Sequence, residues 1–125
     1  MSNKITFYTC RVCKQVVETV HQASGTLVCC GVPMEKLLPN VTEASAEKHV
    51  PVVHIEDGRI KVKIGELPHP MSTEHFIEWV VVAFGNRINR YNLQSAEVAE
   101  AHFCCQDTTD LEVYAYCNLH GLWKV

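Results

Sequence analysis

The sequence lacks the features of a membrane protein, a secreted protein and a nucleic-acid-binding protein. It has no run of about 20 apolar residues, the length that a helix needs to cross a bilayer, and its first residues, MSNKITFYTC, do not resemble a signal peptide. It has no cluster of Lys and Arg, and its formal net charge is -3, so the electrostatic footprint of a nucleic-acid binder is missing. We expect a soluble, cytoplasmic protein that contacts neither membrane nor nucleic acid.

Helical periodicity, internal repeats and low-complexity stretches are also nearly absent. The 125 residues are enough for one hydrophobic core with a small module beside it. We place the module at residues 1–37 and the larger domain at residues 38–125. The first segment has little continuous apolar sequence and cannot bury enough surface to fold without a staple, which a bound metal would supply.

Cysteine and histidine are abundant, with seven of each. Thiols stay reduced in the cytoplasm, and an odd count cannot form a complete disulfide framework, so clustered cysteine indicates a metal site. Cys10 and Cys13 form a CxxC, and Cys29 and Cys30 are adjacent. Adjacent residues of an extended strand point to opposite faces, so this pair can share a metal only if the backbone turns, as Gly31 would allow. A site of four thiolates suits zinc and iron equally.

From Val50 onward the pattern is typical of short strands separated by turns. RIKVKI alternates, with Ile60, Val62 and Ile64 on one face, and the preceding Asp57-Gly58 predicts a tight hairpin turn after VPVVHI. Further strands are predicted in HFIEWVVVAF, RINRYNL, EAHFCC and LEVYAY. The fold class is therefore mainly β, an antiparallel sandwich. In the connector, Asn40 or Thr42 is expected to cap a helical turn that runs from residue 43 to residue 46.

Three histidines occupy junctions between loops and strands, where a rigid sheet can aim them into one pocket. His49 lies in AEKHVP, His69 lies in the stiff loop LPHP, and His75 opens a long strand. Near the end of the chain, Cys117 and His120 form a Cys-x2-His pair. That spacing alone is compatible with a structural zinc clip, a copper loop or a catalytic centre.

The remaining histidines and cysteines are expected to lie outside any site. His54 and His102 fall inside strand patterns and His21 in the small module, so all three are expected to be exposed or satisfied by local partners. Cys104 and Cys105 have no CxxC partner and no following glycine, and we interpret them as structural or incidental thiols.

Four blocks occur in order along the chain: CxxC with a later CC, EKHVP, HPM-x3-H, and CNxHGxW. In their order and spacing, over nearly the whole length, the chain resembles the desulfoferrodoxins, the two-iron superoxide reductases. The resemblance implies a desulforedoxin-like module followed by an immunoglobulin-like sandwich, with two iron ions per chain. It assigns the first iron to the four N-terminal cysteines. It assigns the second to four equatorial imidazoles and one axial thiolate: His49, His69, His75, His120 and Cys117.

The activity that the resemblance implies is the reduction of superoxide to hydrogen peroxide without evolution of oxygen, using an electron from rubredoxin or a similar donor. It also implies a homodimer. Lys48 would attract the superoxide anion and deliver a proton to it. A local positive charge is needed for the attraction because the negative net charge of the chain does not attract an anion over long range. Glu47 would be the carboxylate that can occupy the sixth position of the oxidised iron.

Two other classes of protein share part of this pattern. A blue-copper electron carrier is also a β-sandwich with a Cys-x2-His near its end, but no methionine follows His120, and the additional histidines and the four-cysteine module would have no role. A non-catalytic, zinc-stapled binding domain would explain the small module and leave the second ligand set unexplained.

Overall fold

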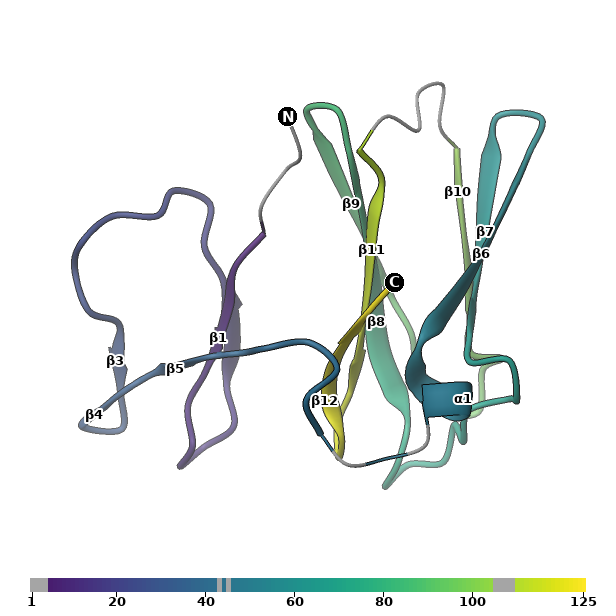
Figure 1. Cartoon of the computed structure of the whole chain (residues 1–125). Coiled ribbons are helices and arrows are strands. Elements are labelled where there is room, and N and C mark those ends of the chain that lie inside the picture. The colour runs from purple at the N-terminus through teal and green to yellow at the C-terminus, as the bar shows by residue number, and fades with distance from the viewer. Residues whose placement is uncertain (1–4, 43, 45, 105–109) are drawn as a thin grey trace. The chain divides into compact units, whose positions relative to one another are not determined.

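The computed structural model (Figure 1) describes residues 5–42, 44, 46–104 and 110–125. The chain divides into two compact units, the first ending at Leu38 and the second beginning at Pro39. No helix among the described residues is long and apolar enough to cross a membrane.

The first unit consists of short strands. Strands β1 (Phe7–Thr9), β2 (Val16–Glu18) and β5 (Glu35–Lys36) form one antiparallel sheet in the order β2-β1-β5, and β3 (Val28–Cys29) pairs with β4 (Val32–Pro33). Of the described residues in this unit, only Phe7 and Cys10 are buried. So small an apolar core cannot by itself offset the conformational entropy lost on folding.

The second unit contains two antiparallel sheets that face each other, with the short helix α1 (Ala46–His49) at one end (Figure 1). The first sheet has the order β10-β7-β6 and the second β12-β11-β8-β9. The first contains β6 (Pro51–Glu56), β7 (Arg59–Ile64) and β10 (Glu100–Cys104). The second contains β8 (Ile77–Phe84), β9 (Arg87–Asn92), β11 (Glu112–Cys117) and β12 (Gly121–Lys124). The predicted β fold with its antiparallel sheets is confirmed.

The core of this unit follows from the alternation seen in the sequence. Ile60, Val62 and Ile64 of β7 are at most 1% exposed, and they pack with apolar residues of β8, β10 and β11. The β6–β7 turn has positive φ at both Asp57 and Gly58, which is the geometry of a tight hairpin. This part of the fold agrees with the sequence-based prediction.

Two details of the prediction are wrong. Asn40 caps no helix, since α1 begins only at Ala46 and the Asn40 side chain instead bonds the backbone of Lys124. The first residue of the predicted helical turn, Glu43, lies outside the described residues. His75 does not open the long strand either, because β8 starts at Ile77 and His75 lies in the bend before it.

Candidate metal centres

The first candidate centre is formed by the four N-terminal cysteines, whose sulfur atoms all lie within 4.8 Å of one another. Cys13 Sγ is 3.6 Å from Cys29 Sγ, and Cys29 Sγ is 4.0 Å from Cys30 Sγ. Sulfur atoms at the corners of a tetrahedron with metal–sulfur bonds of about 2.3 Å stand about 3.8 Å apart. The four cysteines are free thiols, and their spacing fits one tetrahedral metal ion.

The backbone turn that the adjacent cysteines need is present. Cys30 and Gly31 both have positive φ, 52° and 73°, between β3 and β4. The sequence predicted the turn at Gly31, but the left-handed conformation of Cys30 itself was not foreseen. Because Cys30 leaves the extended conformation of Cys29, its side chain stays on the same side of the chain.

The electrostatics of this cluster favour a bound cation. The backbone N–H of Cys13 donates to Cys10 Sγ at 3.5 Å and lowers the pKa of Cys10 to about 6. The neighbouring thiols of Cys13 and Cys10 raise the pKa of Cys29. One thiolate therefore forms readily and a second is opposed by the first, so a cluster of four requires a metal ion to hold them all ionised.

The second candidate centre gathers side chains from four separate segments of the second unit. His49 ends α1, His69 follows β7, and His75 precedes β8, while Cys117 ends β11 and His120 lies in the turn before β12. Donor atoms of His49, His69, His75 and Cys117 lie within 4.8 Å of one another. His49 Nε2 is 3.0 Å from His120 Nδ1, which places the fifth residue in the same cluster.

The four imidazole rings form a square. Neighbouring ring centroids around the sequence His49, His69, His75 and His120 are separated by 4.6, 4.7, 4.9 and 4.9 Å, with interplanar angles of 80–82°. The opposite pair, His49 and His75, is 6.3 Å apart with an angle of 28°. In a tetrahedron all these distances would be similar, so the arrangement is that of four ligands in one plane.

The donor-atom distances fit a metal ion at the centre of that square. For metal–imidazole bonds of about 2.1 Å, adjacent donors at a right angle stand about 3.0 Å apart. The observed separations are 3.0 Å for His49 Nε2 to His120 Nδ1 and 3.1 Å for His49 Nε2 to His69 Nε2. Two ring nitrogens of neutral imidazoles that both keep a lone pair repel at this distance, unless a cation lies between them.

The protonation of the rings also suits metal binding. His69 Nδ1 lies 2.6 Å from the carbonyl oxygen of Pro70, so Nδ1 carries the proton and Nε2 keeps its lone pair. Burial lowers the pKa of His69 to about 4, and burial also lowers the pKa of His75. His75 Nε2 is buried and has no hydrogen-bond partner among the described residues. Both rings are therefore neutral at physiological pH, and each offers a ring nitrogen to a metal ion.

Cys117 is completely buried, and its sulfur lies 3.9 Å from His120 Nδ1. Burial raises the pKa of the Cys117 thiol, while the backbone N–H groups of His120 and Leu119 act in the opposite direction. A nearby cation is what would bring this thiol to the thiolate form in so buried a position. The donor set is thus four imidazole nitrogens and one sulfur.

Comparison with known proteins decides the family. The desulfoferrodoxin profile matches residues 41–125, and the profile of the desulfoferrodoxin N-terminal domain matches residues 2–37. The chain belongs to the desulfoferrodoxin family. A desulfoferrodoxin homolog of Methanothermobacter thermautotrophicus is 43% identical over 93% of this chain and 94% of its own, and a desulfoferrodoxin of Syntrophotalea carbinolica is 42% identical over 99% and 98%.

A solved structure supports the same assignment. The crystal structure of the superoxide reductase from Treponema pallidum superposes with a TM-score of 0.78 at 28% sequence identity, covering 98% of this chain and 99% of that chain. The two groups of donors match the two iron centres of a desulfoferrodoxin, and the family expected from the sequence motifs is confirmed.

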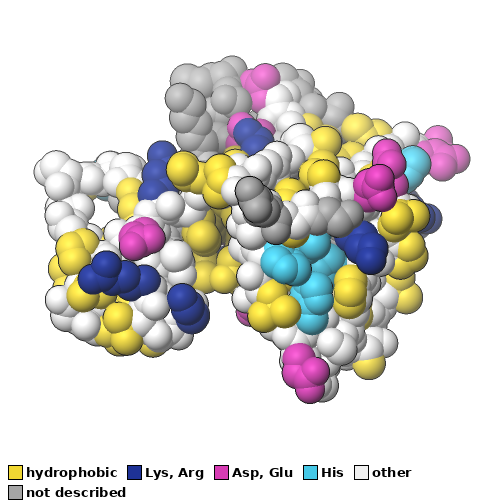
Figure 2. Space-filling model, turned by 60° about the horizontal axis from the view of Figure 1, so that its bottom comes forward, with side chains coloured by type: hydrophobic (Ala, Val, Ile, Leu, Met, Phe, Trp, Pro, Cys, Tyr) yellow, Lys and Arg dark blue, Asp and Glu magenta, His cyan; other side chains and the backbone are white. Residues whose placement is uncertain are grey.

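In this desulfoferrodoxin the histidine cluster lies at the molecular surface. Figure 2 shows the histidine side chains gathered on one face, with apolar side chains beside them and a Lys or Arg side chain nearby. Glu47 and Lys48 are exposed and directly precede His49 on α1. The positive charge of Lys48 adds to burial and to His120 in lowering the pKa of His75, so the ammonium group acts electrostatically on the cluster.

Helix α1 is held against the loop that follows β7. Leu67 N–H donates to Glu47 O at 3.0 Å, and Gly65 N–H donates to Val50 O at 3.2 Å. Gly65 has φ of 81°, and a Cβ there would lie 2.5 Å from both Glu47 O and Lys48 Cα. Only glycine allows this approach, which the sequence pattern did not reveal.

The three histidines that were expected to lie outside the site, and Cys104, do so. His54 and His21 are exposed, and His102 is exposed and pairs with Glu100 at 2.8 Å. Cys104 is exposed, whereas Cys105 lies outside the described residues. One neighbour of the site was missed: Trp123 is buried and stacks on His49 with centroids 4.8 Å apart. Its place in the CNxHGxW block was the available signal.

Proposed function

We propose that this chain is a superoxide reductase. The observation that carries the proposal is the square of four imidazole donors with the Cys117 sulfur beside it, in a chain of the desulfoferrodoxin family. The reaction consumes one superoxide, one electron and two protons and yields hydrogen peroxide. An external donor supplies the electron, and rubredoxin or a similar small carrier suits this role.

Five residues of the chain would hold the catalytic iron: His49, His69, His75, His120 and Cys117. When bound, that iron supplies one-electron chemistry by changing between its ferrous and ferric states. Four neutral imidazoles leave the charge of the ion uncompensated, and the Cys117 thiolate lowers it by one unit. The first iron, held by the four N-terminal cysteines, would be a one-electron carrier.

Lys48 attracts the substrate and supplies a proton. Superoxide is an anion and the chain has a net charge of -3, so attraction depends on local positive charge. Two observations support this role: Lys48 is exposed, and its positive charge contributes to lowering the pKa of His75 in the cluster. Glu47, its neighbour on α1, is the carboxylate that we expect to bind the catalytic iron when that iron is oxidised.

Residues around the histidine ligands hold their rings in a tautomer and an orientation suited to metal binding. The carbonyl of Pro70 fixes the tautomer of His69, and Trp123 fixes the plane of His49 by stacking. A cupredoxin-like carrier needs two histidines and one cysteine in a trigonal arrangement. Four imidazoles in a square do not fit that alternative.

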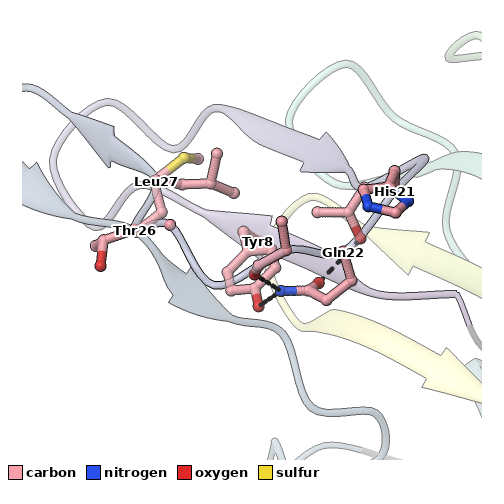
Figure 3. Close-up of a pocket in the computed structure, with 9 residues that line it drawn as sticks. Tyr8, His21, Gln22, Thr26 and Leu27 are labelled. Atoms are coloured by element: carbon pink, nitrogen blue, oxygen red, sulfur yellow. Dashed lines mark hydrogen bonds between the residues drawn. The ribbon is translucent and has the colours of Figure 1, made fainter.

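We also propose a homodimer formed through the first unit. A hollow of about 420 Å³ opens on this unit and is lined partly by Tyr8, His21, Gln22 and Leu27 (Figure 3). Beside the lining residues Thr19 and His21, the Val20 side chain is 97% exposed. A second copy of the chain would cover both features. Val20→Asp should convert a dimer to a monomer in sedimentation, and a monomeric wild-type protein would refute the proposal.

The test of the activity is steady-state superoxide consumption with reduced rubredoxin as donor, with dissolved oxygen followed by an electrode. The expected result is oxidation of rubredoxin in step with superoxide loss, formation of peroxide and no evolution of oxygen. Metal analysis should find two irons per chain. Oxygen evolution, or a protein that binds only zinc or copper, would overturn the proposal.

A further inference from the structure

Asn118 lies between the two C-terminal ligand residues, and its side chain reaches a distant segment. Its Oδ1 accepts a hydrogen bond from Phe76 N–H at 2.9 Å, and its Nδ2 donates to Glu74 O at 2.9 Å. The backbone N–H of Asn118 also donates to Phe76 O at 3.2 Å. The amide side chain is therefore hydrogen-bonded to the backbone of Glu74 and of Phe76, the two residues that flank His75.

The bend that carries His75 is already ordered within itself. His75 N–H donates to Ser72 Oγ at 3.1 Å, and Ser72 N–H donates to His75 O at 3.0 Å. These contacts shape the bend but connect it to no other part of the site. Within the described part of the chain, the side-chain hydrogen bonds of Asn118 connect the backbone of this bend to the turn between Cys117 and His120.

We propose that Asn118 is a positioning residue that sets His75 at the correct place relative to Cys117 and His120. This inference rests on the proposed metal centre, because it concerns the alignment of three of its five donors. His75 Nε2 makes no hydrogen bond of its own among the described residues, so its place depends on its backbone. A half-buried imidazole fixed by neighbouring backbone contacts keeps its nitrogen aimed at the centre of the square without a further partner.

The chain contains a matched control. Asn40 makes the same pair of side-chain bonds, accepting from Lys124 N–H at 2.9 Å and donating to Lys124 O at 2.9 Å. It joins the connector to β12 and contacts neither ligand-bearing segment in these bonds. Its φ is 60°, so replacement by alanine adds backbone strain to the loss of the bonds. Asn40→Ala should therefore destabilise the protein at least as much as Asn118→Ala.

The experiment compares Asn118→Ala, Asn118→Asp and Asn40→Ala by two measurements. In metal-free protein, amide hydrogen exchange at Phe76 directly reports the hydrogen bond from Phe76 N–H to Asn118 Oδ1. This exchange should be about tenfold faster in Asn118→Ala than in the wild type. In iron-loaded, oxidised protein, the thiolate-to-iron absorption band and the midpoint potential report donor alignment. Both should shift in Asn118→Ala and stay at wild-type values in Asn40→Ala.

Asn118→Asp keeps an acceptor for Phe76 N–H but replaces the donor to Glu74 O with a carboxylate oxygen, which repels that carbonyl oxygen. Its Phe76 exchange should match the wild type, with a smaller shift of the band than in Asn118→Ala. An unchanged band in Asn118→Ala despite faster exchange, or equal shifts in Asn118→Ala and Asn40→Ala, would overturn the proposal. If Asn118→Ala does not fold, an unshifted band in Asn118→Asp overturns it. Lack of superoxide reduction by the wild type would reject the proposed activity and leave the exchange result standing.

Discussion

Cys117 lies opposite Ile77 in the pairing of β11 with β8, although the preceding residue Tyr116 pairs with Trp79. Glu78 is therefore an extra residue on β8, and the pair contains a β-bulge. Bulges bend a strand locally and redirect its side chains, and they occur often beside functional sites. Here the bulge coincides with the residue whose sulfur must enter the histidine cluster.

The bulge also explains the burial of β8. Ile77 and Val80 are both buried in the core although an odd number of positions separates them. In a regular strand they would point to opposite faces. The extra residue reverses the alternation between them, so that Ile77 and Cys117 complete the end of the core next to the cluster.

Removal of the Cys117 thiol should damage the catalytic centre and leave the fold intact. Cys117→Ser replaces a soft donor, which can bind a metal ion as a thiolate, with a hydroxyl that does not ionise, so the oxidised centre should lose its thiolate band. The reaction with superoxide should slow by at least about 100-fold, as for the loss of a principal catalytic group. Absorption spectroscopy and pulse radiolysis measure the two effects. Cys104→Ser, at an exposed thiol outside the cluster, should behave as wild type.

Replacement of Lys48 should weaken both the attraction of superoxide and its protonation. In Lys48→Ala the second-order rate with superoxide should fall about tenfold at low ionic strength, and its dependence on ionic strength should flatten. Lys63→Ala is the control, because it removes an exposed positive charge of the same unit on β7. Equal rates for wild type and Lys48→Ala in pulse radiolysis would remove Lys48 from the mechanism.

A side chain at residue 65 should displace α1. In Gly65→Ala the new Cβ meets backbone atoms of Glu47 and Lys48, so the helix has to move and the superoxide reaction should slow. Gly31→Ala imposes similar left-handed strain at φ of 73° but finds open space. It should lower stability by about 1–2 kcal/mol without slowing that reaction. The same kinetic loss in both variants would show that strain alone is responsible.

The metal-free protein should become more stable as the pH rises from about 4 to about 6.5. Burial lowers the pKa of His69 to about 4 in the folded state, whereas an unfolded histidine titrates near about 6.5. Between these two pKa values the unfolded chain binds more protons than the folded chain does, so the free energy of unfolding increases with pH. Urea titrations followed by tryptophan fluorescence measure it. His69→Asn should reduce the slope, and His54→Asn, at an exposed position, should not.

Local patterns in the sequence were sufficient for the strands but not for the details of the site. The alternation of Ile60, Val62 and Ile64 predicted β7 because one face of that strand meets the core and the other meets water. The bulge at Glu78 could not be predicted, since HFIEWVVVAF is compatible with a regular strand. Asn40 was misinterpreted because asparagine suits a helix N-cap and a left-handed position equally, and its partner Lys124 is 84 residues away.

The two ligand sets also differed in how far the sequence alone could predict them. The four cysteines lie in one short segment, and their chemistry alone indicated a metal site. The histidines come from segments far apart, and His49 and His120 are separated by 71 positions. Their places at loop–strand junctions set three of them apart from His54 and His102, but only the family motifs combined them with Cys117 and His120 into one ligand set. Residues that support the ligands, such as Asn118 and Gly65, became visible only through their contacts.

The scarcity of buried residues in the first unit has a consequence for a cell that is short of iron. Only Phe7 and Cys10 are buried among the described residues of that unit, so its folded form depends on the ion that it holds. The second unit has a hydrophobic core of its own, so its fold does not depend on a bound ion in the same way. Under iron starvation we expect the first unit to unfold and become sensitive to proteases. The second unit should remain folded and bind iron again when iron returns.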